Sequence, residues 1–248
     1  MTSLSTTQKI LFYYGLSMVI ALAITYLLSW FDLRTLRDVG IWAKPMKFMA
    51  ATAVFCITTV WLTTLVNATV GTSAAFKGVA ALIIITSFFE VAYISLQAAR
   101  GEPSHYNKND AFHIFMFALM GVMAVGLTAS QAWLAWLIWS DLGDAPLSAT
   151  TLGVLLGLVL TFVLATVSGF QLGGHQPPSG VGLALVGWHW KNDLRPAHFL
   201  GVHAQQLIPL AGLLAERFLG AHALAGLGSF AAVYLAAWGS LTWLGLVT

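Results

Sequence analysis

Charged residues are scarce in this chain: Asp, Glu, Lys and Arg make up 8% of its 248 residues, whereas hydrophobic residues make up 58%. Soluble domains carry roughly 25% charged residues, so this composition excludes an ordinary water-soluble protein. The net charge is +2 and the basic residues are dispersed among polar breaks, so we expect no nucleic-acid partner. The chain has one cysteine, Cys56, which excludes an internal disulfide.

Long apolar runs, separated by short polar breaks, are what the sequence has in quantity. A run of about 20 apolar residues crosses a bilayer as a helix. Seven runs predict transmembrane helices near Ile10–Trp30, Lys47–Val66, Val79–Ala99, Phe112–Trp139, Thr150–Gln171, Ala197–Arg217 and Ala225–Val247. We therefore expect an all-α, polytopic membrane protein in contact with the lipid bilayer, with its seven helices in one bundle and a single transmembrane domain over residues 1–248.

The longest polar break runs from Leu172 to Pro196. It contains an apolar stretch that is too short to cross a bilayer, which predicts a re-entrant segment, a lid or a surface strap. Trp188 and Trp190 in this break are expected at the level of the lipid headgroups.

Basic residues are distributed unequally between the two sets of breaks. Lys9, Lys77 and Arg217 lie on one side. The opposite side carries Arg34, Arg37, Lys44, Lys47, Arg100, Lys108, Lys191 and Arg195. Because cytoplasmic loops carry the excess of Lys and Arg, this count predicts an N-terminus outside the cell and a C-terminus inside.

One acidic residue, Glu90, lies near the centre of the third predicted span. An ionised carboxylate at that depth costs at least ~2.5 kcal/mol, so such a residue is usually paired, protonated or beside a water-filled cavity. Tyr93 and Gln97 follow Glu90 at helical spacing, and the stripe continues toward Arg100. Arg100 lies ~15 Å from Glu90 along the helix at 1.5 Å per residue. This stripe predicts a polar track that descends from the basic side. The alternative is a structural role, in which a protonated Glu90 hydrogen-bonds a neighbouring helix.

The sixth predicted span supplies the expected opposite wall of the polar site. His198 and Gln205 share one helical face, and His203 and Gln206 share an adjoining face, so about half of the circumference cannot face lipid. Pro209 has no N–H to donate to the carbonyl of Gln205, which predicts a spare acceptor and a kink beside these side chains.

A histidine also lies near the start of the fourth predicted span. Asn109 or Asp110 is a suitable N-cap, which places His113 one turn inside the helix. Two imidazoles that face each other across a gap suit haem, and three with a carboxylate suit a transition metal. His113, His198 and His203 are therefore the expected ligands if a cofactor is bound.

Small residues in the fifth predicted span form a helix-packing motif. Gly153 and Gly157 make a GxxxG pattern, which predicts close helix packing within the bundle.

The segments QAARGEPSHYN and DLRPAHFLGVHAQQ resemble signatures of a group of uncharacterised bacterial polytopic integral membrane proteins. The resemblance would cover most of the chain. It implies a multi-pass protein of the bacterial inner membrane, and it implies no activity, cofactor or site residue.

The favoured functional hypothesis is a small-molecule or proton-coupled transporter with a pocket open to the cytoplasmic side, in which Glu90 exchanges a proton and His198 and His203 relay it. The residues expected to bind a small polar or anionic substrate are Lys44, Lys47, Tyr93, Gln97, Arg100, Arg195, Gln205 and Gln206.

Two alternatives stay open at this point. One is a membrane-embedded oxidoreductase in which His113, His198 and His203 ligate haem or a transition metal while Glu90 acts as an acid or base. The other is an accessory or assembly subunit of a membrane complex.

Overall fold

The computed structural model describes residues 4–66, 68–143, 146–183 and 187–247. Its helices are α1 (Thr6–Leu28), α2 (Ala43–Val66), α3 (Ala68–Thr72), α4 (Ala74–Arg100), α5 (Ala111–Asp141), α6 (Ala149–Gly174), α7 (Arg195–Leu219), the 3-10 turn η1 (Gly220–His222) and α8 (Ala223–Leu246). A short antiparallel hairpin, β1 (Thr35–Leu36) and β2 (Val39–Gly40), connects α1 to α2.

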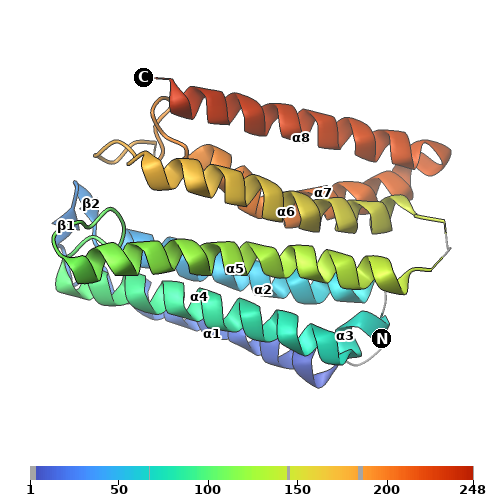
Figure 1. Cartoon of the computed structure of the whole chain (residues 1–248), viewed down its shortest axis with the longest axis horizontal. Helices are drawn as coiled ribbons and strands as arrows, with labels where there is room; N and C mark the ends of the chain where they lie inside the picture. The colour runs from blue at the N-terminus through green and yellow to red at the C-terminus, as the bar shows by residue number, and fades with distance from the viewer. Residues whose placement is uncertain (1–3, 67, 144–145, 184–186, 248) are drawn as a thin grey trace.

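The long helices lie roughly antiparallel to one another along the longest axis of the molecule (Figure 1). Six segments of the described chain are long and apolar enough to cross a membrane, and the sixth, Arg195–Leu246, contains both α7 and α8. The chain reverses direction at η1 between these two helices, and the N- and C-termini lie at opposite ends of the bundle (Figure 1). The expected all-α membrane bundle is therefore confirmed, and each predicted span corresponds to one long helix.

Helix boundaries follow from local capping. Asp110, one of the two N-cap residues that the sequence allows, is the N-cap of α5, and its carboxylate accepts a hydrogen bond from the backbone N–H of His113 at 2.9 Å. Gly101 ends α4 in the left-handed conformation, with φ of 74°. The second span begins at Ala43, four residues earlier than predicted. The helix can include Pro45 because backbone N–H groups in the first turn have no helical acceptor, so the N–H that proline lacks breaks no helical hydrogen bond.

The packing of α6 against α7 depends on small residues. A Cβ atom at Gly153 would meet the backbone carbonyl oxygen of Ile208 at 3.1 Å, and one at Gly157 would meet Cδ of Pro209 at 2.6 Å. On α7, a Cβ at Gly201 would come within 2.8 Å of the backbone nitrogen of Ala165. The predicted close packing at the GxxxG motif is confirmed, and its partner is α7 of the same chain.

The connection between α6 and α7 lies at one end of the bundle, beside the hairpin and the loop between α4 and α5 (Figure 1). Arg37 of the hairpin donates from Nη2 to the carbonyl of Pro177 at 2.5 Å, and Gly180 donates back to the carbonyl of Arg37 at 3.3 Å. Tyr106 donates to the carbonyl of Leu172 at the end of α6. In its described part the connection is therefore a strap tied across the bundle end.

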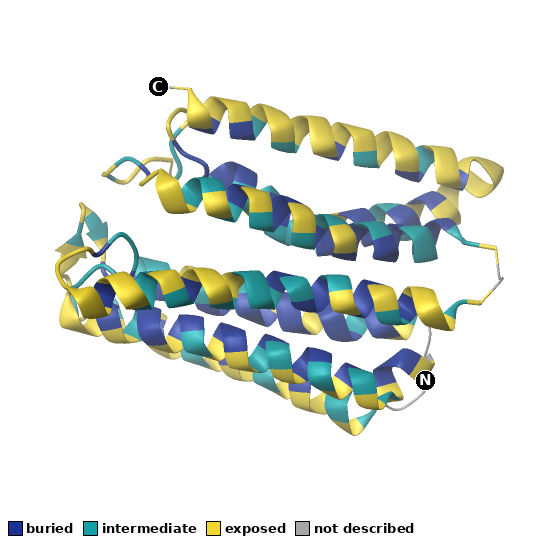
Figure 2. Cartoon of the chain, in the orientation of Figure 1, coloured by how far each residue is buried: buried dark blue, intermediate teal, exposed yellow. Residues whose placement is uncertain are grey.

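Buried residues lie mainly on the inward faces of the helices, and α8 is exposed along most of its length (Figure 2). The largest cluster of buried apolar side chains joins the first six α-helices, α1 to α6. A separate cluster joins α6, α7 and α8.

Candidate functional site

Glu90 is buried in α4, with 5% of its surface exposed. Glu90 is ten positions before Arg100 at the helix end, so its backbone lies ~15 Å from that end at 1.5 Å per residue. Its Oε1 atom is buried and has no hydrogen-bond partner among the residues that the structure describes. A buried polar atom without a partner is unfavourable and is often found where a structure binds a water, an ion or a substrate.

Lys44 provides the cationic neighbour of Glu90. Its half-buried side chain extends from the first turn of α2, close enough to Glu90 and to Arg195 for electrostatic interaction. The ammonium group lies 6.0 Å from the ring centroid of Phe48, which is one turn farther along α2. Lys44 therefore connects the buried acid of α4 with the start of α7.

His105, in the loop between α4 and α5, joins this group of side chains although sequence reasoning did not select it. Its ring packs among Phe48, Tyr106 and Phe117, at centroid distances of 6.2, 6.4 and 5.7 Å. Burial, followed by the nearby positive charge of Lys44, holds the pKa of His105 well below its usual range. The imidazole is therefore neutral at physiological pH. Six of the seven histidines, all except His222, lie in or beside the polar breaks of the basic side, and this concentration is the sequence signal that could have selected His105.

His198 and His203 continue the polar group along α7. The Nδ1 atom of His198 lies 3.1 Å from the hydroxyl of Ser168 in α6, and His198 is close enough to both His105 and His203 for electrostatic interaction. The ring of His203 packs 4.1 Å from that of Phe199, which contacts Trp188 of the strap at 5.1 Å. These contacts link the predicted relay histidines to the strap.

Gln205 and Gln206 lie one to two turns deeper in α7. Gln205 is fully buried, and neither polar atom of its side-chain amide has a partner within the described part of the chain. Its backbone N–H donates to Thr161 of α6 at 2.8 Å. Gln206 donates from Nε2 to Thr58 of α2 at 3.3 Å. Pro209 lies within α7, so its missing N–H leaves the carbonyl of Gln205 without that helical donor.

The stripe predicted on α4 divides in the structure. Glu90 lies near Lys44 of α2, whereas Tyr93 packs in a cluster with Met116 and Met120 of α5. Gln97 is buried and donates from Nε2 to the hydroxyl of Tyr93 at 3.0 Å. Arg100, at the end of this second face, lies 3.4 Å from Glu102.

His113 is engaged with carboxylates at the end of the bundle. Its Nδ1 atom lies 2.8 Å from Asp110, and its Nε2 atom lies 3.3 Å from Glu102. The described residues contain no group of three or more His, Cys, Asp or Glu side chains arranged to hold a metal ion. The structure therefore does not gather His113, His198 and His203 into one ligand set.

Arg195 and Lys47 lie at the rim, where Asp193 organises the entry to α7. Asp193 accepts from Nε of Arg195 at 2.8 Å, from Nη2 at 2.6 Å, and from the backbone N–H of His189 at 2.8 Å. Burial raises the pKa of Asp193, but these hydrogen bonds outweigh it and hold the pKa below its usual range. Lys47 is near both charges. Arg195 also donates to the carbonyl of Gly187 at 2.7 Å, which fixes the strap over the site.

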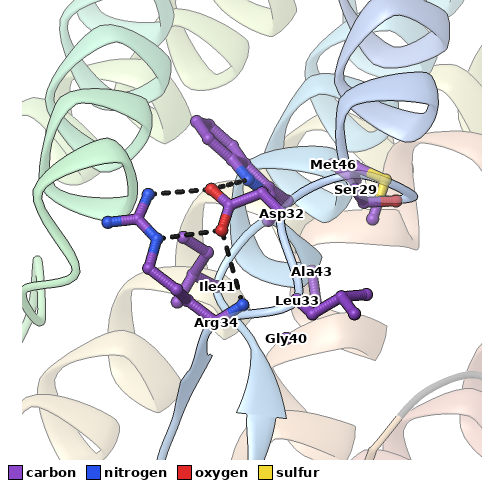
Figure 3. Close-up of a pocket in the computed structure, with 9 residues that line it drawn as sticks. Ser29, Asp32, Leu33, Arg34, Gly40, Ile41, Ala43 and Met46 are labelled. Carbon is purple, nitrogen blue, oxygen red and sulfur yellow. Dashed lines mark hydrogen bonds and ion pairs between the residues drawn. The ribbon is translucent and has the colours of Figure 1, made fainter.

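A second polar group lines a cavity of about 270 Å³ at the hairpin (Figure 3). Asp32 accepts hydrogen bonds from Nε and Nη2 of Arg34, each at 2.8 Å, and from Nε1 of Trp42 at 2.9 Å. Hydrogen bonds from Arg34 first, with a smaller contribution from Trp42, hold the pKa of Asp32 below its usual range. Because both carboxylate oxygens are engaged, we interpret this group as a structural link between α1 and α2.

The fold and the buried polar side chains together define an all-α, multi-pass membrane protein with a polar group of residues between its helices. No protein-family model, curated protein or solved structure matches the chain.

Proposed function

We propose that this protein is a transporter that moves a small polar or anionic molecule together with protons. The observation that carries the proposal is Glu90, a carboxyl group deep in α4 with an unpartnered Oε1 atom among the described residues and Lys44 nearby. Ionisable residues within transmembrane helices are characteristic of substrate pathways and proton relays.

Lys44 supports an anionic substrate. Its ammonium group can interact either with the carboxylate of Glu90 or with a carboxylate or phosphate of the substrate. Protonation of Glu90 releases Lys44 to bind the substrate anion, and departure of the anion favours ionised Glu90 again. This competition for one cation couples proton movement to substrate movement.

The three histidines supply a route for the proton. A neutral imidazole carries one donor and one acceptor, so neighbouring rings and intervening water can pass a proton between them. His105 lies near Lys44, and His198 lies near both His105 and His203. We assign the relay to these residues, with Gln205 and Gln206 as polar contacts for the substrate deeper in the bundle.

The proposed orientation places the strap end in the cytoplasm of a bacterial cell and the N-terminus outside the inner membrane. Support comes from the eight basic residues assigned to this side, because cytoplasmic segments carry the excess of Lys and Arg. The hairpin, the loop between α4 and α5, and the strap lie together at this end (Figure 1).

Flux measurements in reconstituted liposomes test the proposal. Purified protein is incorporated with a trapped pH dye, and a pH gradient is imposed with and without acetate, lactate, succinate or inorganic phosphate outside. We expect proton entry to accelerate with at least one of these anions, and labelled anion to accumulate until a protonophore collapses the gradient. Proton and anion entry no faster than in protein-free liposomes would overturn the proposal.

A further inference from the structure

A second candidate binding site lies on the outside of the bundle, where α4 meets α5. A groove of about 510 Å³ is lined by Ile84, Ile85, Phe88, Phe89, Ala92, Tyr93 and Leu96 of α4 and by Met116 of α5. Ile85, Phe88 and Leu96 are more than half exposed, so the groove opens toward the surrounding lipid. The rings of Phe89 and Tyr93 lie nearly parallel, with centroids 6.4 Å apart, on one side of it.

The length of the groove matches one leaflet of a bilayer. From Ile84 to Leu96 it follows α4 for about 18 Å at 1.5 Å per residue. Half of the ~30 Å hydrocarbon core is about 15 Å, which is the depth that one acyl chain occupies. The groove therefore has the shape and depth for a single acyl chain.

Charged side chains of both signs follow directly after the groove. Arg100 is one turn beyond Leu96 on α4, and His113 is one turn before Met116 on α5. Glu102 lies between them, 3.4 Å from Arg100 and 3.3 Å from Nε2 of His113. The hydrogen bond from the backbone N–H of His113 first, followed by that from its ring, holds the pKa of Asp110 below its usual range, so this carboxylate is ionised.

These groups keep the capacity to bind a further partner. The side chains of Arg100 and Glu102 are 54% and 35% exposed, and their mutual contact is long for an ion pair. A carboxylate offers about four acceptor positions, so Glu102 can accept another donor while it contacts its neighbours. A guanidinium with free donors beside two carboxylates is complementary to a phosphate that carries an ammonium group.

We propose that this groove binds a phospholipid whose headgroup ends in a primary ammonium, such as phosphatidylethanolamine. One acyl chain lies along Phe88, Ala92 and Leu96, the phosphate contacts Arg100, and the ammonium donates to Glu102 and Asp110. The proposal is independent of the transport function, because it concerns a different face of α4.

Binding of defined lipids to the purified, delipidated protein tests this site. Native mass spectrometry and thermal denaturation are compared for phosphatidylethanolamine, phosphatidylcholine and phosphatidylglycerol with identical acyl chains. A trimethylated headgroup donates no N–H, and the glycerol headgroup has no cation. We expect phosphatidylethanolamine to bind about tenfold more tightly than either, the effect of one or two charge-assisted hydrogen bonds.

Two variants with a matched control locate the lipid. Ala92→Trp fills the groove and is expected to lower the affinity for phosphatidylethanolamine at least about fivefold, whereas Ala81→Trp, on the same face of α4 but outside the groove, leaves it unchanged. Glu102→Gln is expected to reduce the preference over phosphatidylcholine to near one. Equal binding of the three lipids, or equal binding by the two tryptophan variants, would overturn the proposal.

Discussion

Gly157 of α6 lies directly against the ring of Pro209 in α7: a Cβ at residue 157 would be 2.6 Å from Cδ and 2.9 Å from Cγ of that ring. The contact holds α7 against α6 at the level where Pro209 leaves the carbonyl of Gln205 without a helical donor. The small residue on α6 and the proline on α7 thus position the deepest polar side chains of the proposed site.

Gly157→Ala is expected to destabilise the protein by about 1–3 kcal/mol, because the added methyl group overpacks a rigid contact with Pro209 and with the carbonyl of Ala204. Thermal denaturation in detergent measures the effect. Gly173→Ala in the same helix is the control, since a Cβ there meets nothing within 4 Å. Equal melting temperatures for the two variants would show that α6 and α7 do not pack this closely.

Asp193→Asn is expected to lower stability by about 2 kcal/mol, because it removes a charge that Arg195 and two backbone N–H groups stabilise. The side chain of Asp193 is fully buried. Asp38→Asn, at an exposed hairpin position, is the matched control and should change stability little. A variant at residue 193 as stable as the control would contradict the role assigned to this ion pair.

The same carboxylate predicts a dependence of stability on acid. The pKa of Asp193 is lower in the folded protein than the ordinary value of about 3.9. Its contribution to the free energy of unfolding is therefore fully present above about pH 4 and is lost as the pH falls through the pKa of the folded protein. The difference in melting temperature between wild type and Asp193→Asn should therefore be constant near neutral pH and shrink below about pH 4. A difference in melting temperature that grows in acid would show that folding does not lower the pKa of Asp193.

Lys44→Met is expected to raise the KM for the transported anion at least about tenfold, since it removes a charge-assisted contact worth about 1.5–3 kcal/mol. Lys77→Met, an exposed lysine near the start of α4, is the matched control. The measurement is anion uptake in liposomes at a fixed pH gradient. An unchanged KM in the residue 44 variant would exclude Lys44 from substrate binding.

Much of the fold was predictable because apolar length is a strong signal. Each expected span corresponds to one long helix, and the capping of α5 by Asp110 follows from residue type. The start of α2 was less predictable, since Lys44 and Pro45 resemble loop residues by composition. The structure includes both in the helix, where Lys44 can approach Glu90.

The site was predictable as a set of residue types but not as a set of neighbours. Helical spacing placed Tyr93 and Glu90 on one broad stripe, yet adjacent parts of that stripe contact different helices, α5 and α2. Which helix packs on which face depends on the order of helices in the bundle, and periodicity carries no information on this order. His105 was not selected for the same reason, because a loop residue has no helical face from which to infer its neighbours.

The central claim is that the carboxyl of Glu90 carries the proton that drives transport. The most direct test is anion-dependent proton entry into liposomes that contain wild type, Glu90→Gln or Glu216→Gln protein. Glu216 accepts from the backbone N–H of Thr150 at 2.8 Å, outside the proposed site, and glutamine keeps an acceptor there. We predict that Glu90→Gln abolishes coupled proton entry while Glu216→Gln retains it. Coupled proton entry at the wild-type rate in Glu90→Gln would contradict the account.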